Sequence, residues 1–450
     1  MKKSRLYMTL VASAIVLSII SCAVIGGSGA GHQGKAMDEM PSVESLKPVG
    51  GYPDVMTFID GTKVGSKEDW ASRAQEISNM YQYYMYGVWR DGSDEDVTYK
   101  YTPGANNLTG RLAITIKRKS TGVSKSMTVN VQLPDASQLK APNGGWPLVV
   151  GMHGMIQERV ATSRGYAVIT LNTNEIATDN NRRTGIFYDL YPYGTDWKEQ
   201  TGVLMAWSWG ASKVLDALEN GAGKELNING ANSIITGVSR WGKAAAVCGT
   251  FEKRFKMVAP SCSGAGGVAM YRYVSEGKTY DFTSKNAPAS YKYTKNEPLD
   301  SLQATGEQGW FNGNFMKFKD PDVFPMDQHF LCAINADPNR YFFIIGSCTG
   351  EDWVNAPAMW LAYRAALPVY EFLGLGDHIV ANIHKSGHAV IEEDMNYMID
   401  YFNEKVYNIP SKRDLSNLKT SVFELPVNKD PLFDSFGGTK PKLPKPDAKN

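Results

Sequence analysis

The sequence predicts one large α/β domain, in which a mostly parallel sheet is covered by helices on both faces. Two observations carry this prediction: short apolar runs separated by long intervals, and a helical pattern before the third run. Strands that are apolar throughout are typical of a parallel sheet buried on both faces. The expected strands are the runs 147–154, 166–172, 233–239, 255–261, 341–347 and 378–384. The expected helix lies within 201–219, where apolar residues recur on one face from Val203 to Leu218.

Two further elements are expected before this sheet. Ser66 and Asp69 form a capping pattern, and apolar residues then recur at helical spacing from Trp70 to Tyr84. We therefore expect an amphipathic helix that Gly87 ends. Residues 112–116 and 127–131 each alternate apolar and polar side chains on either side of a turn near residue 122, which predicts an antiparallel hairpin.

The N-terminus has the pattern of an export signal. Basic residues precede an apolar run over 6–20, which is short for a membrane span of about 20 apolar residues. The run leads into Ser21 and Cys22 and resembles a bacterial lipobox, in which Cys22 would be lipidated; an ordinary cleavable signal is the alternative. We expect a signal peptide over 1–21, a flexible tether over 22–50, the α/β domain over 51–425 and a Pro/Lys-rich tail over 426–450. The mature chain would be an exported lipoprotein at the outer membrane or cell surface.

Composition narrows the classes of partner. The chain has 450 residues, 43% of them hydrophobic, and a formal net charge of +1, which gives no support for a nucleic-acid partner. We expect membrane contact only through the lipid anchor, and a monomer. Four cysteines remain besides Cys22, and their spacing matches no zinc pattern, so we expect disulfides or buried thiols at Cys248, Cys262, Cys332 and Cys348.

The third expected strand leads into a turn that carries a serine. The segment 237–243 reads GVSRWGK, with Ser239 between a buried strand and the start of a helix. Such a turn lifts the serine above the sheet, and N–H groups of the helix N-terminus face a developing oxyanion. The run is one residue longer than the usual G-x-S-x-G elbow, and a structural turn that needs glycines for close packing is the alternative. Ser239 is the candidate nucleophile.

The partners of Ser239 follow from chain order. In hydrolases with a serine on such a turn, the acid and then the histidine follow the serine. His388 lies in a Gly-containing loop directly after the last expected strand, whereas the other histidines beyond Ser239 lie within that strand or in a long polar stretch. His388 is therefore the expected base. Glu351 and Asp352 follow the preceding strand, where either carboxylate could accept a hydrogen bond from the imidazole.

With these residues, the chain resembles the glucuronoyl esterases, serine hydrolases of plant cell-wall breakdown with an α/β-hydrolase fold. Residues 237–243 match the family elbow G-C-S-R-x-G-K, including the extra residue and the arginine. Residues 201–218 resemble the family helix G-x-L-x-A-W-A-W-G-x-S-R, and residues 260–267 resemble P-x-E-S-G-A-G-G. Weaker matches are GEQGWF at 306–311 and EDW at 351–353. The resemblance, which is to bacterial members, spans roughly residues 51–408.

The chain departs from the family pattern in two places. The family often carries a disulfide between positions that are Val238 and Ala389 here, so the resemblance implies no such bridge. The triad glutamate of many members corresponds to Cys262, and a thiol cannot stabilise an imidazolium as a carboxylate does. Some bacterial members use a second acid position, which the resemblance places at Glu351 or Asp352. We expect Asp352 to be the triad acid, with Glu351 as its rival.

The resemblance implies roles for four more residues. Arg240 would stabilise the oxyanion, because a guanidinium with fixed donors does so more strongly than neutral amides alone. Lys243 and Glu307 would hydrogen-bond sugar hydroxyls, and Trp353 would line the sugar site. Solvated surface charge is the alternative for Lys243 and Glu307.

The expected function is hydrolysis of esters on the carboxyl group of (4-O-methyl)glucuronate in glucuronoxylan, as in lignin–carbohydrate esters. Ser239, His388 and Asp352 would form the triad, and we expect no metal and no cofactor. The expected partner is xylan substituted with glucuronic acid, or a lignin–carbohydrate ester. One alternative is a carbohydrate O-acyl esterase, for example on acetylated xylan, with the same triad. Another is a glycan-binding surface lipoprotein with a decayed active site, for which Cys262 is the only hint.

Overall fold

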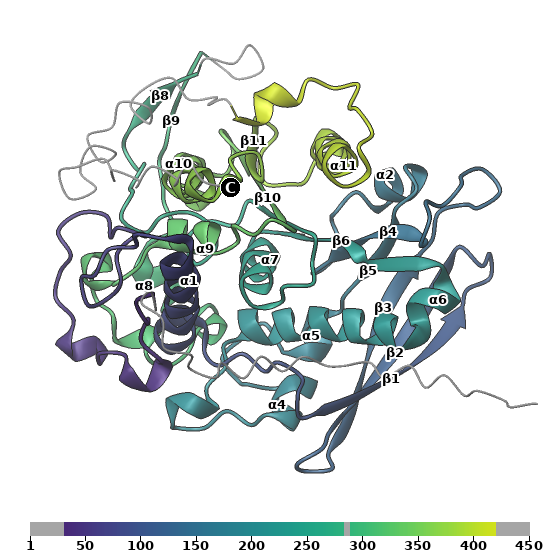
Figure 1. Ribbon diagram of the computed structural model, residues 1–450, viewed down its shortest axis with the longest axis horizontal. Helices are drawn as coiled ribbons and strands as arrows, with labels where there is room; N and C mark the ends of the chain where they lie inside the picture. The colour runs from purple at the N-terminus through teal and green to yellow at the C-terminus, as the bar shows by residue number, and fades with distance from the viewer. Residues whose placement is uncertain (1–30, 283–288, 420–450) are drawn as a thin grey trace, which may run out of the picture. The chain divides into compact units, whose positions relative to one another are not determined.

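The computed structural model describes residues 31–282 and 289–419, and those from His32 onward belong to one compact unit. In this part of the chain the main sheet has the strand order β1-β2-β3-β5-β4-β6-β7-β10-β11 (Figure 1). All six expected strands are present, as β4, β5, β6, β7, β10 and β11, and neighbours among them pair in parallel. The fold prediction is confirmed in its central sheet.

The helices are α1 (Lys67–Tyr81), α2 (Glu158–Ser163), α3 (Thr173–Ile176), α4 (Ile186–Leu190), α5 (Val203–Ala217), α6 (Gly223–Leu226), α7 (Arg240–Phe251), α8 (Leu299–Leu302), α9 (Gln328–Ala333), α10 (Ala356–Leu373) and α11 (Glu392–Tyr407). The strands are β1 (Glu95–Pro103), β2 (Thr109–Arg118), β3 (Ser124–Gln132), β4 (Trp146–Gly151), β5 (Ala167–Thr170), β6 (Ile228–Val238), β7 (Met257–Ser261), β8 (Thr279–Asp281), β9 (Ser290–Lys292), β10 (Tyr341–Ser347) and β11 (Ile379–His384).

Helices cover both faces of the parallel strands. In Figure 1, α5, α7 and α10 lie on one side of the sheet, and α2 and α11 on the other. Successive strand residues point to opposite faces, so Ile235 packs in the core cluster that includes α5, α7 and α10, while Ile234 packs with α2 and α11. This two-sided burial is the physical reason why these strands are apolar throughout.

The expected hairpin is β2 and β3, and it is part of a larger unit. Leu112, Ile114 and Ile116 of β2 and Met127, Val129 and Val131 of β3 are all at most 1% exposed. The sequence did not reveal β1, which pairs antiparallel with β2, nor that β3 joins the main sheet through β5. Partly buried and exposed positions alternate along β1, and its apolar residues Val97, Tyr99 and Tyr101 pack against the core only in part.

The N-terminal helix begins and ends where the sequence predicts. Ser66 caps α1 by accepting a hydrogen bond from the Asp69 N–H, and a π-helical turn, Gln82–Tyr86, carries the helix to Gly87. Gly87 has a φ of 83°, and a Cβ there would lie 2.3 Å from the Gln200 carbonyl oxygen. Both the conformation and the space therefore require glycine.

The predicted tether over 22–50 is wrong for residues 32–50. The side chains of Met40 and Val43 are buried in the main core cluster. The Glu76 carboxylate of α1 accepts a hydrogen bond from the Lys35 N–H, and Tyr84 donates one to the Pro41 carbonyl. The Gly/Ser-rich composition that suggested a tether ends at residue 34, and apolar residues beyond it dock on the domain.

Cys248, Cys262, Cys332 and Cys348 are buried free thiols. Of the two alternatives expected for them, disulfides or buried thiols, the structure shows the second. The signal peptide with Cys22 and the tail over 426–450 lie outside the described residues and stay predictions, as does the monomer. Within residues 31–282 and 289–419, no helix is both long enough and apolar enough to cross a membrane.

Candidate active site

Ser239 occupies a strained turn between β6 and α7. Its φ is 62° and its ψ is −126°, in a region that a residue with a Cβ adopts at a cost. The Ser239 N–H donates to the Ser261 carbonyl at the end of β7, which ties the turn to the neighbouring strand. The strain is held by the surrounding sheet, and such strain is characteristic of functional sites. This is the strand, turn and helix expected of a nucleophile elbow.

The two glycines of the elbow permit close packing. A Cβ on Gly237 would lie 2.6 Å from the Trp241 carbonyl oxygen, and one on Gly242 would lie 2.2 Å from the Ser261 carbonyl oxygen. No side chain fits at either distance. The extra residue in the elbow moves the second glycine to the position where α7 approaches the end of β7. The longer spacing is therefore a packing solution, and it is compatible with a nucleophile.

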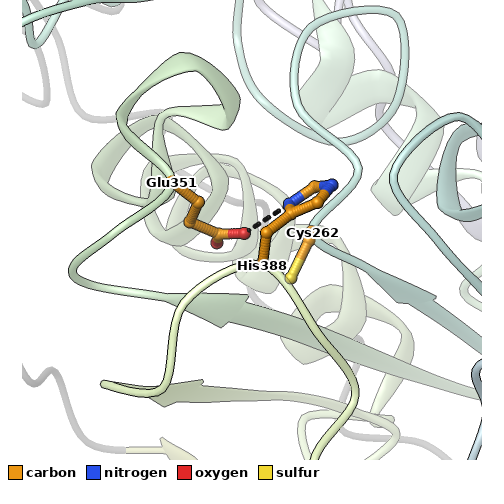
Figure 2. Close-up of side chains that lie close together, drawn as sticks. All are labelled: Cys262, Glu351 and His388. Carbon is orange, nitrogen blue, oxygen red and sulfur yellow. Dashed lines mark hydrogen bonds and ion pairs between the residues drawn. The ribbon is translucent and has the colours of Figure 1, made fainter.

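His388 pairs with Glu351. The Nδ1 atom of His388 lies 2.9 Å from Oε2 of Glu351, and Figure 2 shows the carboxylate directed at the imidazole ring. The other oxygen of Glu351 accepts a hydrogen bond of 2.6 Å from the Ser347 N–H at the end of β10. Glu351 is 1% exposed, whereas the His388 side chain is 24% exposed. A buried, fixed carboxylate thus orients a partly accessible imidazole.

Burial raises the pKa of Glu351 above its usual value, because the charged form loses hydration. Hydrogen bonding to His388, contact with the Cys262 thiol and the Ser347 N–H each oppose this rise. A buried carboxylate whose pKa is shifted by burial and by a specific histidine partner is a candidate for a functional site.

Asp352, the expected triad acid, does not contact His388 and the prediction is wrong on this point. Its carboxylate accepts hydrogen bonds from the Tyr291 hydroxyl at 2.7 Å and from the N–H and hydroxyl of Thr294, both at 2.8 Å. These bonds tie the side chain to Tyr291 of β9 and to Thr294 just after it. The rival assignment, Glu351, is the one that the geometry supports.

Cys262 lies beside this pair. Its Sγ atom, one Glu351 oxygen and one His388 nitrogen all lie within 4.8 Å of one another. The thiol is fully buried, and burial followed by the nearby Glu351 charge raises its pKa well above the usual value. Cys262 therefore carries a neutral thiol next to the carboxylate, consistent with its place at the position where the family often has its glutamate.

Ser239 and His388 approach from adjacent parts of the same sheet edge. Ser239 follows β6, Cys262 follows β7, Glu351 follows β10 and His388 follows β11, and these strands are consecutive in the sheet. Within the described residues no hydrogen bond joins the Ser239 hydroxyl to His388. Catalytic hydrogen bonds are often long without substrate and tighten in the complex.

Arg240 is held in place beside Ser239. Its guanidinium donates to Asp179 at 2.7 Å and lies 5.1 Å from the centre of the Trp310 ring. Asp179 also accepts a hydrogen bond of 2.7 Å from the Trp310 indole. The Arg240 side chain is 39% exposed, so part of the cation remains accessible. Asp179 and Trp310 thus fix a cation next to Ser239 without burying it.

Lys243 differs from its expected role as a direct ligand of sugar hydroxyls. Its ammonium donates to the carbonyl oxygens of Ser263 and Ala265 and to Glu297, at 2.7, 2.6 and 2.7 Å. A lysine has three N–H donors, and here all three are used inside the protein while the side chain is buried. In the structure Lys243 positions Glu297 and the loop after β7.

Glu307 and Trp353 each present a group that the described residues leave without a hydrogen-bond partner or exposed. Oε2 of Glu307 is buried and has no hydrogen-bond partner among the described residues. Burial raises the pKa of Glu307, the Glu297 charge adds to the rise, and the charges of Lys243 and Arg240 oppose it. Trp353 is 39% exposed, and its ring lies 5.0 Å from the ring of His388. An unpaired buried carboxylate oxygen and an exposed aromatic face are compatible with the predicted sugar site.

Asp179 and Glu297 are contacts that the sequence did not predict. Both are acidic residues in irregular segments, far along the chain from the side chains that they contact, and no spacing rule connects them to Arg240 or Lys243. Gly264 gives an indirect sign, because a Cβ there would lie 2.5 Å from the Glu297 carboxylate. The glycine-rich segment after β7 is what lets this carboxylate approach.

Comparison with known proteins places the chain in a family. A family model described as glucuronyl esterase of fungi matches residues 114–374. A multidomain esterase of Ruminococcus flavefaciens is 56% identical over 402 residues, which cover 88% of this chain and 51% of that protein. A 4-O-methyl-glucuronoyl methylesterase of Cerrena unicolor is 30% identical over 370 residues, covering 80% of this chain and 69% of that protein. The chain therefore spans about half the length of the Ruminococcus flavefaciens protein.

Solved structures agree with this assignment. The chain is similar to a carbohydrate esterase family 15 glucuronoyl esterase from Caldicellulosiruptor kristjansonii, with 37% identity, a TM-score of 0.74 and coverage of 88% of this chain and 99% of that one. It is also similar to the glucuronoyl esterase catalytic domain from Hypocrea jecorina, with 26% identity, a TM-score of 0.67 and coverage of 85% and 95%. These similarities confirm the α/β-hydrolase fold and the resemblance drawn from the elbow, and the chain belongs to the glucuronoyl esterase family.

Proposed function

We propose that the protein is a serine esterase that hydrolyses esters on the carboxyl group of glucuronate or 4-O-methylglucuronate residues. The observation that carries the proposal is the hydrogen bond between buried Glu351 and partly exposed His388, which lies at the same sheet edge as the strained Ser239 turn. Family membership supports the substrate class, since the Cerrena unicolor relative is named for action on a 4-O-methylglucuronoyl methyl ester.

The reaction proceeds through an acyl-enzyme. The Ser239 hydroxyl oxygen attacks the ester carbonyl carbon while Nε2 of His388 takes its proton. The tetrahedral intermediate then collapses, and the imidazolium returns that proton to the departing alcohol. A water molecule, activated by the same Nε2 atom, attacks the acyl-enzyme and releases the free glucuronate and Ser239. Proton transfers therefore cancel over the cycle, and the net reaction is ester plus water giving acid plus alcohol.

Glu351 keeps the imidazole in the productive tautomer. With the carboxylate 2.9 Å from Nδ1, the proton of neutral His388 resides on Nδ1 and leaves Nε2 free as a base. When Nε2 accepts the serine proton, the imidazolium forms beside a buried negative charge. Glu351 is 1% exposed, so water screens its charge little. The buried carboxylate therefore stabilises the imidazolium more than a carboxylate in water would.

Arg240 stabilises the oxyanion together with N–H groups of the elbow. Two contacts fix its guanidinium: the ion pair with Asp179 and the face of the Trp310 ring. Donors that are already oriented need no reorganisation when negative charge develops on the substrate oxygen. The Asp179 bond uses one of the five N–H donors of the guanidinium. Donors remain for a substrate oxygen.

The sugar ring is held by an acidic side chain, Glu307, and an aromatic one, Trp353. Glu307 offers a buried oxygen with no partner among the described residues, and Trp353 offers an exposed face beside His388. Lys243 acts indirectly in this proposal by holding Glu297, since its own donors are occupied. Uronic acids carry hydroxyls that donate to carboxylates and faces that stack on indole rings.

The test compares two ester classes on the purified chain. We expect hydrolysis of the methyl ester of 4-O-methylglucuronate with a kcat/KM well above that for 4-nitrophenyl acetate, and loss of both activities in Ser239→Ala. The reverse preference would favour the carbohydrate O-acyl esterase. No hydrolysis of either ester by a folded wild-type protein would contradict the proposal and favour a glycan-binding role.

A further inference from the structure

Cys262, Glu351 and His388 form a cluster whose chemistry the esterase reaction does not fully use. Among residues 31–282 and 289–419 they are the group of three whose donor atoms lie close enough together to hold a metal ion. Figure 2 shows the three side chains converging from different loops at the sheet edge. A serine esterase needs only the carboxylate and the imidazole of this group, so the thiol adds a donor of a different kind.

The distances suit a small tetrahedral ion. Zinc binds thiolate sulfur at about 2.3 Å and nitrogen or oxygen at about 2.0–2.1 Å, which puts tetrahedral donor atoms roughly 3.3–3.6 Å apart. The Nδ1 and Oε2 atoms are 2.9 Å apart and would separate slightly. The sulfur is within 4.8 Å of both and would move inward by about 1 Å, which a side-chain rotation can supply.

We propose that Cys262, Glu351 and His388 form a zinc-binding site that inhibits the esterase. Zinc on Nδ1 would replace the hydrogen bond to Glu351 and move the ring proton to Nε2. With a proton on Nε2, His388 cannot accept the proton of Ser239, and the base is lost. The binding half of this proposal stands on the cluster alone, whereas the inhibition half rests on the proposed function.

The charges and protons balance. The Cys262 thiol loses its proton to the buffer, Glu351 binds as a carboxylate, and neutral His388 changes tautomer without net proton loss. One Zn²⁺, one thiolate and one carboxylate then give a site of no net charge, which suits a cluster in which two of the three members are buried. Water fills the fourth position, and the 24% exposure of His388 provides the approach from solvent.

The donor set selects the class of ion. A thiolate, an imidazole and one carboxylate suit zinc and similar borderline ions, while magnesium and calcium prefer sites made of oxygen ligands alone. The inhibition should therefore be specific to thiophilic divalent ions. The ion is an inhibitor in this proposal, so the expectation of a metal-independent reaction is unaffected.

The test uses the full chain with Co²⁺ as a spectroscopic probe and zinc chloride as the inhibitor. Wild type and Ser239→Ala should both show a thiolate-to-cobalt charge-transfer band, which is read without any esterase activity. Cys262→Ser should lose the band, and Cys262→Ala serves if that variant does not fold. Cys348→Ser, which changes another buried free thiol, is the matched control and should keep the band.

Activity on a glucuronate ester gives the second readout. Each variant is compared with its own rate in the absence of zinc. The zinc concentration for half inhibition should rise by at least about 10–100-fold in Cys262→Ser, since even loss of an outer-shell partner weakens a metal site by that factor. A chelator should restore the wild-type rate, and magnesium at equal concentration should leave it unchanged.

The outcomes separate the two proposals. A cobalt band that depends on Cys262 but no esterase activity would support the site and contradict the proposed function. Full esterase activity without a cobalt band, or zinc inhibition that is equal in wild type and Cys262→Ser, would overturn the zinc site and leave the esterase standing. Loss of the band in Cys348→Ser but not in Cys262→Ser would also overturn it.

Discussion

The assignment of Glu351 as the triad acid predicts a large effect of Glu351→Gln. The change keeps the shape of the side chain and replaces one carboxylate oxygen by an NH₂ group. The Ser347 N–H, 2.6 Å from Oε1, requires an acceptor there, so the amide oxygen stays on that side. The NH₂ group then faces Nδ1 of His388, where only a ring nitrogen without a proton can accept from it. The variant therefore favours the tautomer with its proton on Nε2, which cannot act as base.

The size of the effect follows from this tautomer change. The same kind of substitution in a Ser-His-Asp triad lowers kcat by about 10⁴, which corresponds to about 5 kcal/mol of transition-state stabilisation. We expect a loss of about 10³–10⁴ in kcat on a glucuronate methyl ester, measured by methanol release. The midpoint of thermal unfolding should change little. The substitution removes a buried negative charge, and burial already disfavours that charge by raising the pKa of Glu351.

Asp352→Asn is the matched control for this measurement. Its carboxylate bonds to Tyr291 and Thr294 and not to His388, so its loss should cost about 1–3 kcal/mol of stability and less than about tenfold in kcat. If Asp352→Asn were the crippling change and Glu351→Gln the mild one, the reasoning from the hydrogen bonds would be refuted.

Three more predictions concern the sugar site, the elbow and acid stability. Glu307→Gln should raise KM by about tenfold or more with a smaller change in kcat, because a hydrogen bond to a charged group is worth about 1.5–3 kcal/mol; an unchanged KM would remove Glu307 from the sugar site. Gly242→Ala should lower the free energy of unfolding in urea by about 1–3 kcal/mol because its Cβ would meet the Ser261 carbonyl, whereas Gly154→Ala, where a Cβ meets nothing within 4 Å, should not. Burial lowers the pKa of His329 from 6.5 to about 4, so the unfolded chain binds a proton that the folded one does not. Stability should then be complete above about pH 6.5 and fall by about 3 kcal/mol as the pH drops toward 4; His329→Gln should flatten this slope, and an unchanged slope would contradict the assignment.

The sequence predicts best what periodicity and chain order determine. Six buried strands, the capped helix after Ser66 and the helix before β6 have patterns that repeat over many residues, and each is where it was expected. The candidate nucleophile Ser239 and the candidate base His388 are predicted from their places after two of these strands. The first strand of the antiparallel unit, β1, was missed, although Val97, Tyr99 and Tyr101 alternate with polar residues along it; these three side chains are only partly buried.

The errors concern groups whose direction depends on loop conformation. Glu351 and Asp352 are neighbours, and only the backbone path after β10 decides which faces His388. Lys243 was expected to meet substrate, but the loop after β7 folds over it and takes two of its donors. Asp179 and Glu297 reach the site from distant segments, and no spacing rule in a single sequence identifies such contacts; the glycine at position 264 is only an indirect sign of the approach of Glu297.

The central claim is that Ser239 is the nucleophile of a glucuronate esterase. The most direct test measures kcat of wild type and Ser239→Ala on the methyl ester of 4-O-methylglucuronate, with thermal unfolding as a check that both are folded. The account predicts that the variant loses activity by a factor on the order of 10⁴–10⁶ while its unfolding midpoint is nearly unchanged. A folded Ser239→Ala protein that keeps more than a few per cent of the wild-type rate would contradict it.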